Sequence, residues 1–218
     1  MLPLPTTITL SEAILVVALF SGISVLQFFR GRRINLELMR HSVRVLERVL
    51  SPRDKNYTLV GLYVGYKAVL WLDRGPLNRA EVTVLFLPRY SAFYYPISKL
   101  VTRFDRVYLT YWYSRYLGEE LHLVKHGAYR RSPRKIIKGF DSMQQRELEI
   151  DGHKFVAVYR SERHLGKLVK FVRDVGADIV NHVAIVPENR SLYIYAKLDP
   201  LRFERFVEKS YELARSLA

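Results

Sequence analysis

Cysteine is absent from this 218-residue sequence. The absence excludes disulfide bonds, thiol catalysis and any metal site that requires cysteine ligands. Three common catalytic signatures are absent as well: a phosphate-binding glycine loop, a nucleophile elbow and an HExxH zinc motif. We therefore expect a protein that is not an enzyme and that uses no cofactor and no metal.

Positive charge is missing from the N-terminal part of the chain. Residues 1–29 contain no lysine or arginine and a single acid, Glu12, whereas the whole chain has a net charge of +14. The rest of the chain therefore carries +15, which favours a polyanionic partner, either nucleic acid or an anionic lipid surface. A generally basic, soluble surface would give the same charge. With 49% hydrophobic residues, most of the chain is expected to fold around a core.

The uncharged N-terminal part contains one long apolar segment. Leu10 to Phe29 would form a helix of about 30 Å, the thickness of a hydrocarbon layer, and Thr9 and Glu12 have the spacing of a capping box at its start. We predict a membrane-spanning anchor. A buried core helix and a cleaved signal peptide are the alternatives, but the latter lacks a positive start and small residues near a cleavage site.

Three arginines, Arg30, Arg32 and Arg33, follow the apolar segment directly. Because basic flanks stay on the cytoplasmic side of a membrane, they predict a single-pass protein of the cell membrane with its N-terminus outside. Residues 1–33 would then be the anchor and residues 34–218 a basic cytoplasmic domain. We expect the arginines to orient the membrane helix.

The remaining sequence predicts an α+β domain with a mixed or antiparallel sheet and helices packed on one side. Its two halves, about 34–115 and 116–218, each contain a strand, a helix and a strand, which leaves an internal duplication open. Helices are predicted at 34–50, 91–103, 162–175 and from residue 199 to about residue 217. Strands are predicted at 57–64, 66–72, 80–87, 107–112, 119–124, 145–150, 153–159, 181–186 and 191–197. Turns are predicted at Gly75-Pro76 and Asp151-Gly152.

Titratable residues give little indication of catalysis. His122 and His126 are separated by four positions at a predicted strand end, but no third metal ligand accompanies them. Glu119 and Glu120 are neighbours, so in a strand they point to opposite faces and cannot share a proton. We expect these glutamates to be solvated surface residues.

A basic segment at 125–138, KHGAYRRSPRKIIK, contains no acid. Its glycine, serine and proline predict a loop, and its dense positive charge predicts mobility until a polyanion binds. Structured RNA is the partner we favour, with anionic lipid headgroups and a merely solvated loop as alternatives. The candidate binding residues are Lys125, Arg130, Arg131, Arg134, Lys135 and Lys138.

The order of these features resembles a known family. After the anchor, the basic flank and a helix come the sequence NYTLVG at 56–61, a strand at Val82–Phe86, a helix at Tyr90–Arg103 and a strand at Arg106–Trp112. This succession is similar to the membrane anchor and cytosolic domain of calumin, the coiled-coil subunit of the PAT (protein associated with translocon) complex. Beyond residue 115 the similarity is one of element order.

The resemblance implies a non-enzymatic, translocon-associated factor of membrane-protein biogenesis. Such proteins bind the ribosome at the protein-conducting channel and act as intramembrane chaperones with small membrane partners and insertases of the YidC/Oxa1 type. The relatives also carry a signal peptide, an acidic lumenal region and a long charged coiled coil, which these 218 residues lack. We therefore expect a minimal, archaeal form in which ribosomal RNA contacts the basic segment.

Overall fold

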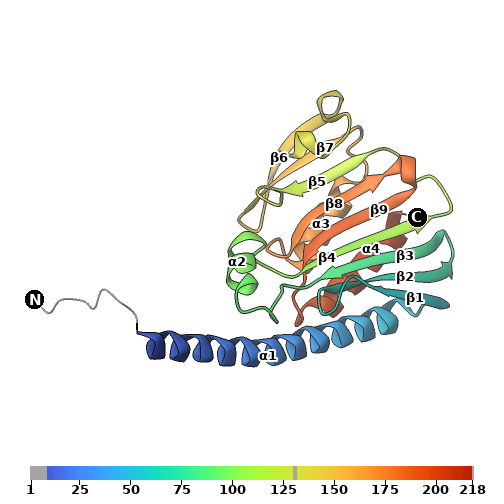
Figure 1. Ribbon diagram of the computed structural model, residues 1–218. Coiled ribbons are helices and arrows are strands. Elements are labelled where there is room, and N and C mark those ends of the chain that lie inside the picture. The colour runs from blue at the N-terminus through green and yellow to red at the C-terminus, as the bar shows by residue number, and fades with distance from the viewer. Residues whose placement is uncertain (1–8, 130–131, 218) are drawn as a thin grey trace, which may run out of the picture.

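The computed structural model describes residues 9–129 and 132–217 of the protein. Figure 1 shows one long helix running along the side of a broad sheet and extending well beyond it. The helices are α1 (Leu10–Leu50), α2 (Tyr94–Val101), α3 (Leu165–Val175) and α4 (Phe203–Leu217). Short 3₁₀ turns are η1 (Pro133–Lys135), η2 (Phe140–Ser142) and η3 (Pro187–Asn189).

The strands form a single nine-stranded sheet within the described residues, and every neighbouring pair is antiparallel. They are β1 (Asp54–Leu59), β2 (Gly65–Arg74), β3 (Leu77–Leu85), β4 (Arg106–Tyr113), β5 (Leu121–Lys125), β6 (Gln144–Ile150), β7 (His153–Tyr159), β8 (Val180–Val186) and β9 (Ser191–Lys197). Their order across the sheet is β1-β2-β3-β4-β9-β8-β5-β7-β6. The predicted α+β class is confirmed, and the sheet is antiparallel rather than mixed. Both predicted halves contribute to it, and they meet at the β4–β9 pair.

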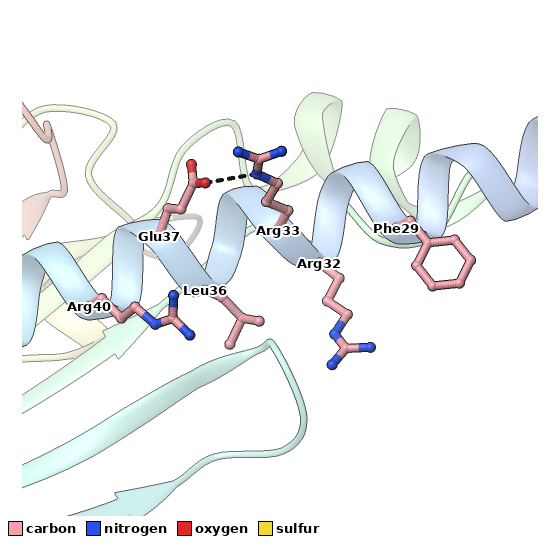
Figure 2. Close-up of a pocket in the computed structure, with 6 residues that line it drawn as sticks. All are labelled: Phe29, Arg32, Arg33, Leu36, Glu37 and Arg40. Carbon is pink, nitrogen blue, oxygen red and sulfur yellow. Dashed lines mark hydrogen bonds and ion pairs between the residues drawn. The ribbon is translucent and has the colours of Figure 1, made fainter.

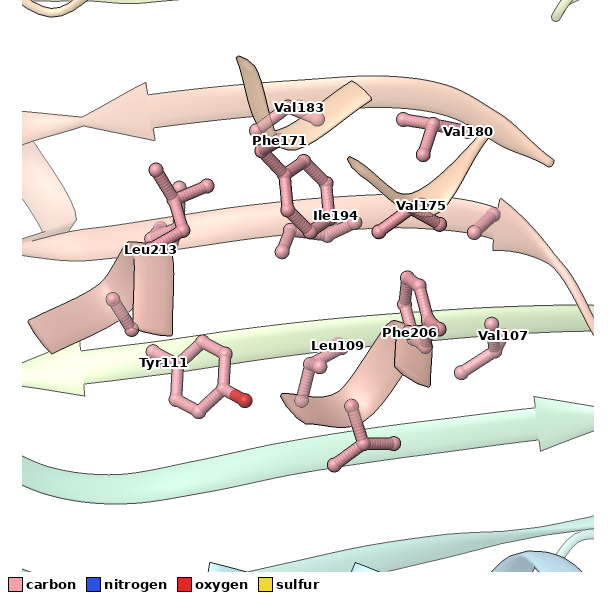
Figure 3. Packing of buried hydrophobic residues seen from close by; sticks show 14 of the residues in the cluster. Val107, Leu109, Tyr111, Phe171, Val175, Val180, Val183, Ile194, Phe206 and Leu213 are labelled. Carbon is pink, nitrogen blue, oxygen red and sulfur yellow. The ribbon is translucent and has the colours of Figure 1, made fainter. Parts of the chain in front are cut away.

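One face of the sheet carries the main core. Strand β4 shows why: Val107, Leu109, Tyr111 and Tyr113 are buried at alternate positions, as expected for a strand with one covered face. Helices α3 and α4 and the C-terminal half of α1 cover this face (Figure 1). Figure 3 shows side chains of α3 and α4 packed over β4, β8 and β9. At about 25 cal/mol per Å² of apolar surface, such burial is the main force that holds the layers together.

Helix α1 is continuous from Leu10 to Leu50, so the predicted helix at 34–50 is not a separate element. Thr9 caps its start through the predicted capping box with Glu12. The helix passes through Gly31 because no proline or cap interrupts it there, and a single glycine costs a helix only about 1 kcal/mol. The expected boundary between anchor and domain at residue 33 thus lies inside one rigid helix.

The predicted turns at Gly75-Pro76 and Asp151-Gly152 are present, but one predicted strand ends early. Asp151 and Gly152 both have positive φ angles and join β6 to β7 by the expected tight turn. Strand β1 ends at Leu59 rather than at residue 64. The following residues turn back instead, with positive φ at Gly61 and Tyr63 and a hydrogen bond from the Val60 amide to the Gly65 carbonyl. The β1–β2 turn formed by residues 60–64 can therefore contact α1.

Candidate functional surfaces

The N-terminal half of α1 is apolar and exposed. It is long and apolar enough to cross a membrane, and none of the 18 residues in its most apolar window is buried. The domain therefore does not wrap it as a core helix. Within this stretch the Ser21 hydroxyl donates to the Val17 carbonyl of its own helix, which satisfies that polar group in an apolar surrounding.

The arginine flank follows Gln27 and Phe28, which already contact the domain. Arg30 and Arg33 are exposed, and Arg33 pairs with Glu37 one turn later at 2.9 Å. The Arg32 guanidinium lies 5.0 Å from the centre of the Tyr63 ring, which comes from the β1–β2 turn. Figure 2 shows Arg32 and Leu36 on one side of the helix and the Arg33–Glu37 pair on another. The predicted orienting residues thus lie at the point where the helix leaves the domain. We call Arg30, Arg32 and Arg33 the arginine collar.

Residues 87–90 and the β1–β2 turn hold α1 at this collar. The Gln27 side chain donates to the Arg89 carbonyl at 2.6 Å, and the buried Asn35 side chain donates to the carbonyls of Tyr63 and Leu87. Gly31 is buried against the Arg89 backbone, with no room for a side chain. These contacts fix the direction in which the exposed apolar half leaves the domain.

The basic segment at 125–138 is placed differently from the predicted mobile loop. Lys125 belongs to β5, is half-buried and donates to the Ala177 carbonyl at 2.8 Å, and burial lowers the pKa of its ammonium group. Arg134 pairs with Asp141. Lys135 and Lys138 are exposed, whereas Arg130 and Arg131 lie outside the described residues. Arg134, Lys135 and Lys138 therefore all lie at the surface, where a polyanion could reach them.

Apolar residues bind this segment to the open face of the sheet. Ile137 and Met143 are buried against Val124 and Val158, which point away from the main core. A loop that buries two large apolar side chains loses much of its freedom. The prediction that the segment is a loop rather than a packed element is therefore wrong for Lys125 and Ile137, because the sequence signals of charge and glycine hid the apolar positions between them.

Tyr129 begins a buried hydrogen-bonded chain across the sheet. Its hydroxyl lies 2.7 Å from His182 Nδ1, His182 Nε2 lies 3.2 Å from His122 Nδ1, and His122 Nε2 lies 3.0 Å from the Glu120 carboxylate. With both histidines neutral, these contacts assign one direction of donation, from Tyr129 through His182 and His122 to Glu120. The sequence prediction that Glu120 is a solvated surface residue is corrected: it accepts a hydrogen bond from a buried histidine.

Among the described residues, no third side chain joins His122 and His182 in an arrangement for a metal ion. His126 is exposed beside Glu147, away from His122, and the described part of the chain contains no group of three side chains arranged for a metal ion. Burial lowers the pKa of His182 to about 3, and it lowers the pKa of His122 against the opposing effect of Glu120. These hydrogen bonds therefore hold Tyr129, and with it the basic segment, against the sheet.

The burial of His182 in this hydrogen-bonded chain predicts that the protein loses stability at mildly acidic pH. Unfolded histidine has a pKa near 6.5, so the unfolded state takes up protons below that pH while His182 stays neutral in the folded state. Stability is complete above pH 6.5 and falls as the pH decreases toward 3. Between pH 7.5 and pH 5, His182 alone should lower the free energy of unfolding by about 2 kcal/mol. Urea titrations of the protein and of His182→Gln should show the smaller pH dependence in the variant, and equal slopes would contradict the assignment.

An aromatic surface on the open face of the sheet was missed by the sequence reasoning. The outward positions of β4 include Tyr108, Thr110 and Trp112. Tyr108 stacks on Tyr195 with ring centres 4.9 Å apart, and the Arg79 guanidinium lies over the Trp112 ring. The alternation in β4 could have revealed these outward aromatics. It does not reveal that β9 lies beside β4 and supplies Tyr195.

Searches against protein-family models and against curated proteins found no match to this chain. The assignment of function therefore depends on the surfaces described above and on the sequence resemblance.

Proposed function

We propose that the protein is a single-pass, membrane-anchored, non-enzymatic adaptor that binds the ribosome at the protein-conducting channel and assists membrane-protein insertion. The observation that carries this proposal is the continuity of α1, whose exposed apolar half and packed second half form one helix. A helix held by the domain as far back as Gln27 acts as an anchor rather than as a removable leader. The arginine collar favours a cytoplasmic domain and an outside N-terminus.

Strand directions support a position of the basic segment on the anchor side of the domain. In the antiparallel sheet, the end of β5 lies at the same end as the end of β1 and the start of β4. That end also carries the β1–β2 turn, which contacts α1 at the collar. The segment after Lys125 therefore leaves the sheet on the side where the apolar half of α1 emerges. A ribosome on the channel would present its RNA to this side.

Ribosomal RNA is the proposed polyanion because the basic segment also contains Tyr129, whose ring lies 5.6 Å from the Tyr195 ring of the aromatic open face. Phosphate contacts with basic side chains give salt-dependent affinity without base specificity. The similarity to calumin supports the same setting, with a YidC/Oxa1-type insertase or a small membrane partner beside the anchor. The effective concentration at the channel would be raised because the anchor confines the domain to the bilayer.

Ribosome co-sedimentation from a detergent extract tests the proposal. A variant with Arg130, Arg131, Lys135 and Lys138 changed to glutamate should bind at least about tenfold more weakly at low salt, because each lost phosphate contact removes counterion release. The matched control changes four exposed arginines on the helix-covered side by the same total charge: Arg163, Arg173, Arg205 and Arg215. The control should retain most of the binding.

Two outcomes contradict parts of this proposal. Absence of co-sedimentation of the unchanged protein at low salt would exclude the ribosome as partner. Equal losses in the two variants would show that net charge, and not the segment, determines binding. A second candidate function, a membrane-tethered scaffold on anionic lipid, is favoured by the position of the segment at the anchor side. Binding that resists nuclease and requires anionic vesicles would support it.

A further inference from the structure

Helix α2 directs its apolar side away from the protein. Tyr94, Ile97, Leu100 and Val101 share one side of the helix and are between 51% and 79% exposed, and none of its residues is buried. Phe93, just before the helix, is 68% exposed. A surface helix normally turns such residues toward the core. A contiguous exposed apolar surface of this kind marks a contact with another apolar phase.

A second apolar group lies at the same end of the sheet. Leu59 at the end of β1 is 61% exposed, and Leu62 in the β1–β2 turn is 71% exposed. The antiparallel register puts the end of β1, the end of β3 and the start of β4 at one end, and α2 connects β3 to β4. Figure 1 places α2 at the end of the domain that faces the exposed half of α1. The two apolar groups therefore face in the direction of that half.

The position of α2 along α1 is fixed by contacts at the collar. The loop that leads into α2 contains Arg89 and Tyr90, whose backbone packs on Gly31. The Tyr63 ring of the β1–β2 turn lies 6.4 Å from the Phe28 ring and 6.1 Å from the Tyr90 ring. If residues 10–29 fill the hydrocarbon layer, these contacts lie at the level of the lipid headgroups.

We infer that α2 and the β1–β2 turn insert their apolar side chains into the interfacial layer of the same bilayer that α1 crosses. The inference depends on the proposed anchor. Interfacial helices bury their apolar side about 5–10 Å into the boundary between headgroups and acyl chains. Tyrosine is suited to this layer because its ring is apolar and its hydroxyl is polar. Lys99 and Arg103, both exposed on and just after α2, would contact anionic headgroups.

The lipid surface is the occupant because the rings of Phe28, Tyr63 and Tyr90 connect the apolar half of α1 to the β1–β2 turn and to the loop that leads into α2. The collar arginines and the two cations of the α2 region border it on the side where anionic headgroups would lie. The domain would then rest on the membrane at two points, the anchor and α2. This arrangement fixes the tilt of the sheet, and it determines which edge the domain offers to a complex on the membrane.

Spin labels measure the depth of these residues directly. Because the sequence contains no cysteine, single-cysteine variants of the full-length protein can be labelled with a nitroxide in phosphatidylcholine–phosphatidylglycerol vesicles. Labels at Ile97→Cys and Leu100→Cys should show a several-fold higher ratio of oxygen to water-soluble nickel collisions than a label at Tyr116→Cys. Tyr116 is a matched control because it is 66% exposed and follows β4 at the opposite end of the sheet.

A fourth label, at Leu19→Cys, separates this inference from the proposed anchor. A lipid-embedded label at 19 together with water-exposed labels at 97 and 100 would overturn the inference and leave the anchor intact. Water exposure at 19 would overturn the anchor and the inference with it. Pure lipid vesicles contain no other kind of protein, and a protein-to-lipid ratio low enough to separate the copies leaves lipid as the only shield of positions 97 and 100. Adding Leu100→Glu to the Ile97→Cys variant should reduce the oxygen ratio at 97 through the cost of burying a carboxylate.

Discussion

Replacing Gly31 by alanine is expected to lower the free energy of unfolding by about 3 kcal/mol, the upper end of the usual range for overpacking. A Cβ atom at this position would lie 2.0 Å from the Arg89 carbonyl oxygen and 2.4 Å from the Tyr90 backbone nitrogen. Neither neighbour is the end of a flexible side chain, so helix and loop would have to separate. The contacts of Gln27 and Asn35 with the same loop would weaken as well.

The measurement uses the two tryptophans of the protein, which both lie in the sheet. Trp71 in β2 and Trp112 in β4 report unfolding by fluorescence in urea and a non-denaturing detergent. Gly22→Ala is the matched control, since it lies in the same helix with nothing within 4 Å of its added Cβ. That variant should be as stable as the original protein or slightly more so, because alanine favours helix. Equal losses in the two variants would contradict the close packing at Gly31.

The substitution also has a functional consequence. Gly31 fixes the loop that leads into α2, so its replacement should lower the oxygen collision ratio of a label at Ile97. A label at Leu19 should keep its depth, because the apolar half of α1 would still cross the bilayer. The proposed membrane contact of α2 would therefore depend on the same glycine as the stability of the fold.

Much of the fold could be predicted from local sequence because one face of most strands is buried. The alternation of Val107, Leu109 and Tyr111 with outward residues is visible in the sequence, as is the Asp151-Gly152 turn. Which strands pair over long distances is not visible. The β4–β9 and β5–β8 pairs depend on how a whole face packs against the helices, and no local pattern encodes that choice.

The candidate surfaces were harder to predict for a related reason. Composition identified residues 125–138 as basic, but burial of Lys125, Tyr129 and Ile137 depends on strands that are distant in sequence. The sequence predicts a helix at 91–103, but it does not show that the apolar residues of α2 are exposed. Hydrophobic periodicity predicts which apolar residues of a helix are buried. It therefore does not identify apolar residues whose role depends on their exposure.

Replacing Asp105 by alanine is expected to have the largest effect, a loss of about 3–5 kcal/mol, because it leaves a buried charge without its partner. The Asp105 carboxylate accepts two hydrogen bonds from the Arg89 guanidinium, at 2.8 and 2.7 Å, and a third from the Leu87 amide. The side chains of Asp105 and Arg89 are only 6% and 17% exposed. Because both side chains are so little exposed, water can replace only part of these interactions.

A double-mutant cycle separates the charge pair from simple loss of packing. Asp105→Ala combined with Arg89→Met removes both charges, so the double variant should lose clearly less stability than the sum of the two single losses. Glu37→Ala is the control for an exposed pair: its partner Arg33 is 82% exposed, and the expected loss is below about 1 kcal/mol. Additive losses at Asp105 and Arg89 would show that the pair is not coupled.

The position of this pair explains why a buried charge is retained there. Arg89 donates to Asn35 on α1 through its side chain and accepts from Gln27 through its backbone, so Asp105 fixes a residue that contacts α1 at two points. An apolar pair could fill the space, but it could not orient the loop against the helix. Asp105→Ala should therefore also lower the oxygen collision ratio of a label at Leu100, while the label at Leu19 stays embedded. Loss of stability without any change at Leu100 would confine the role of the pair to folding.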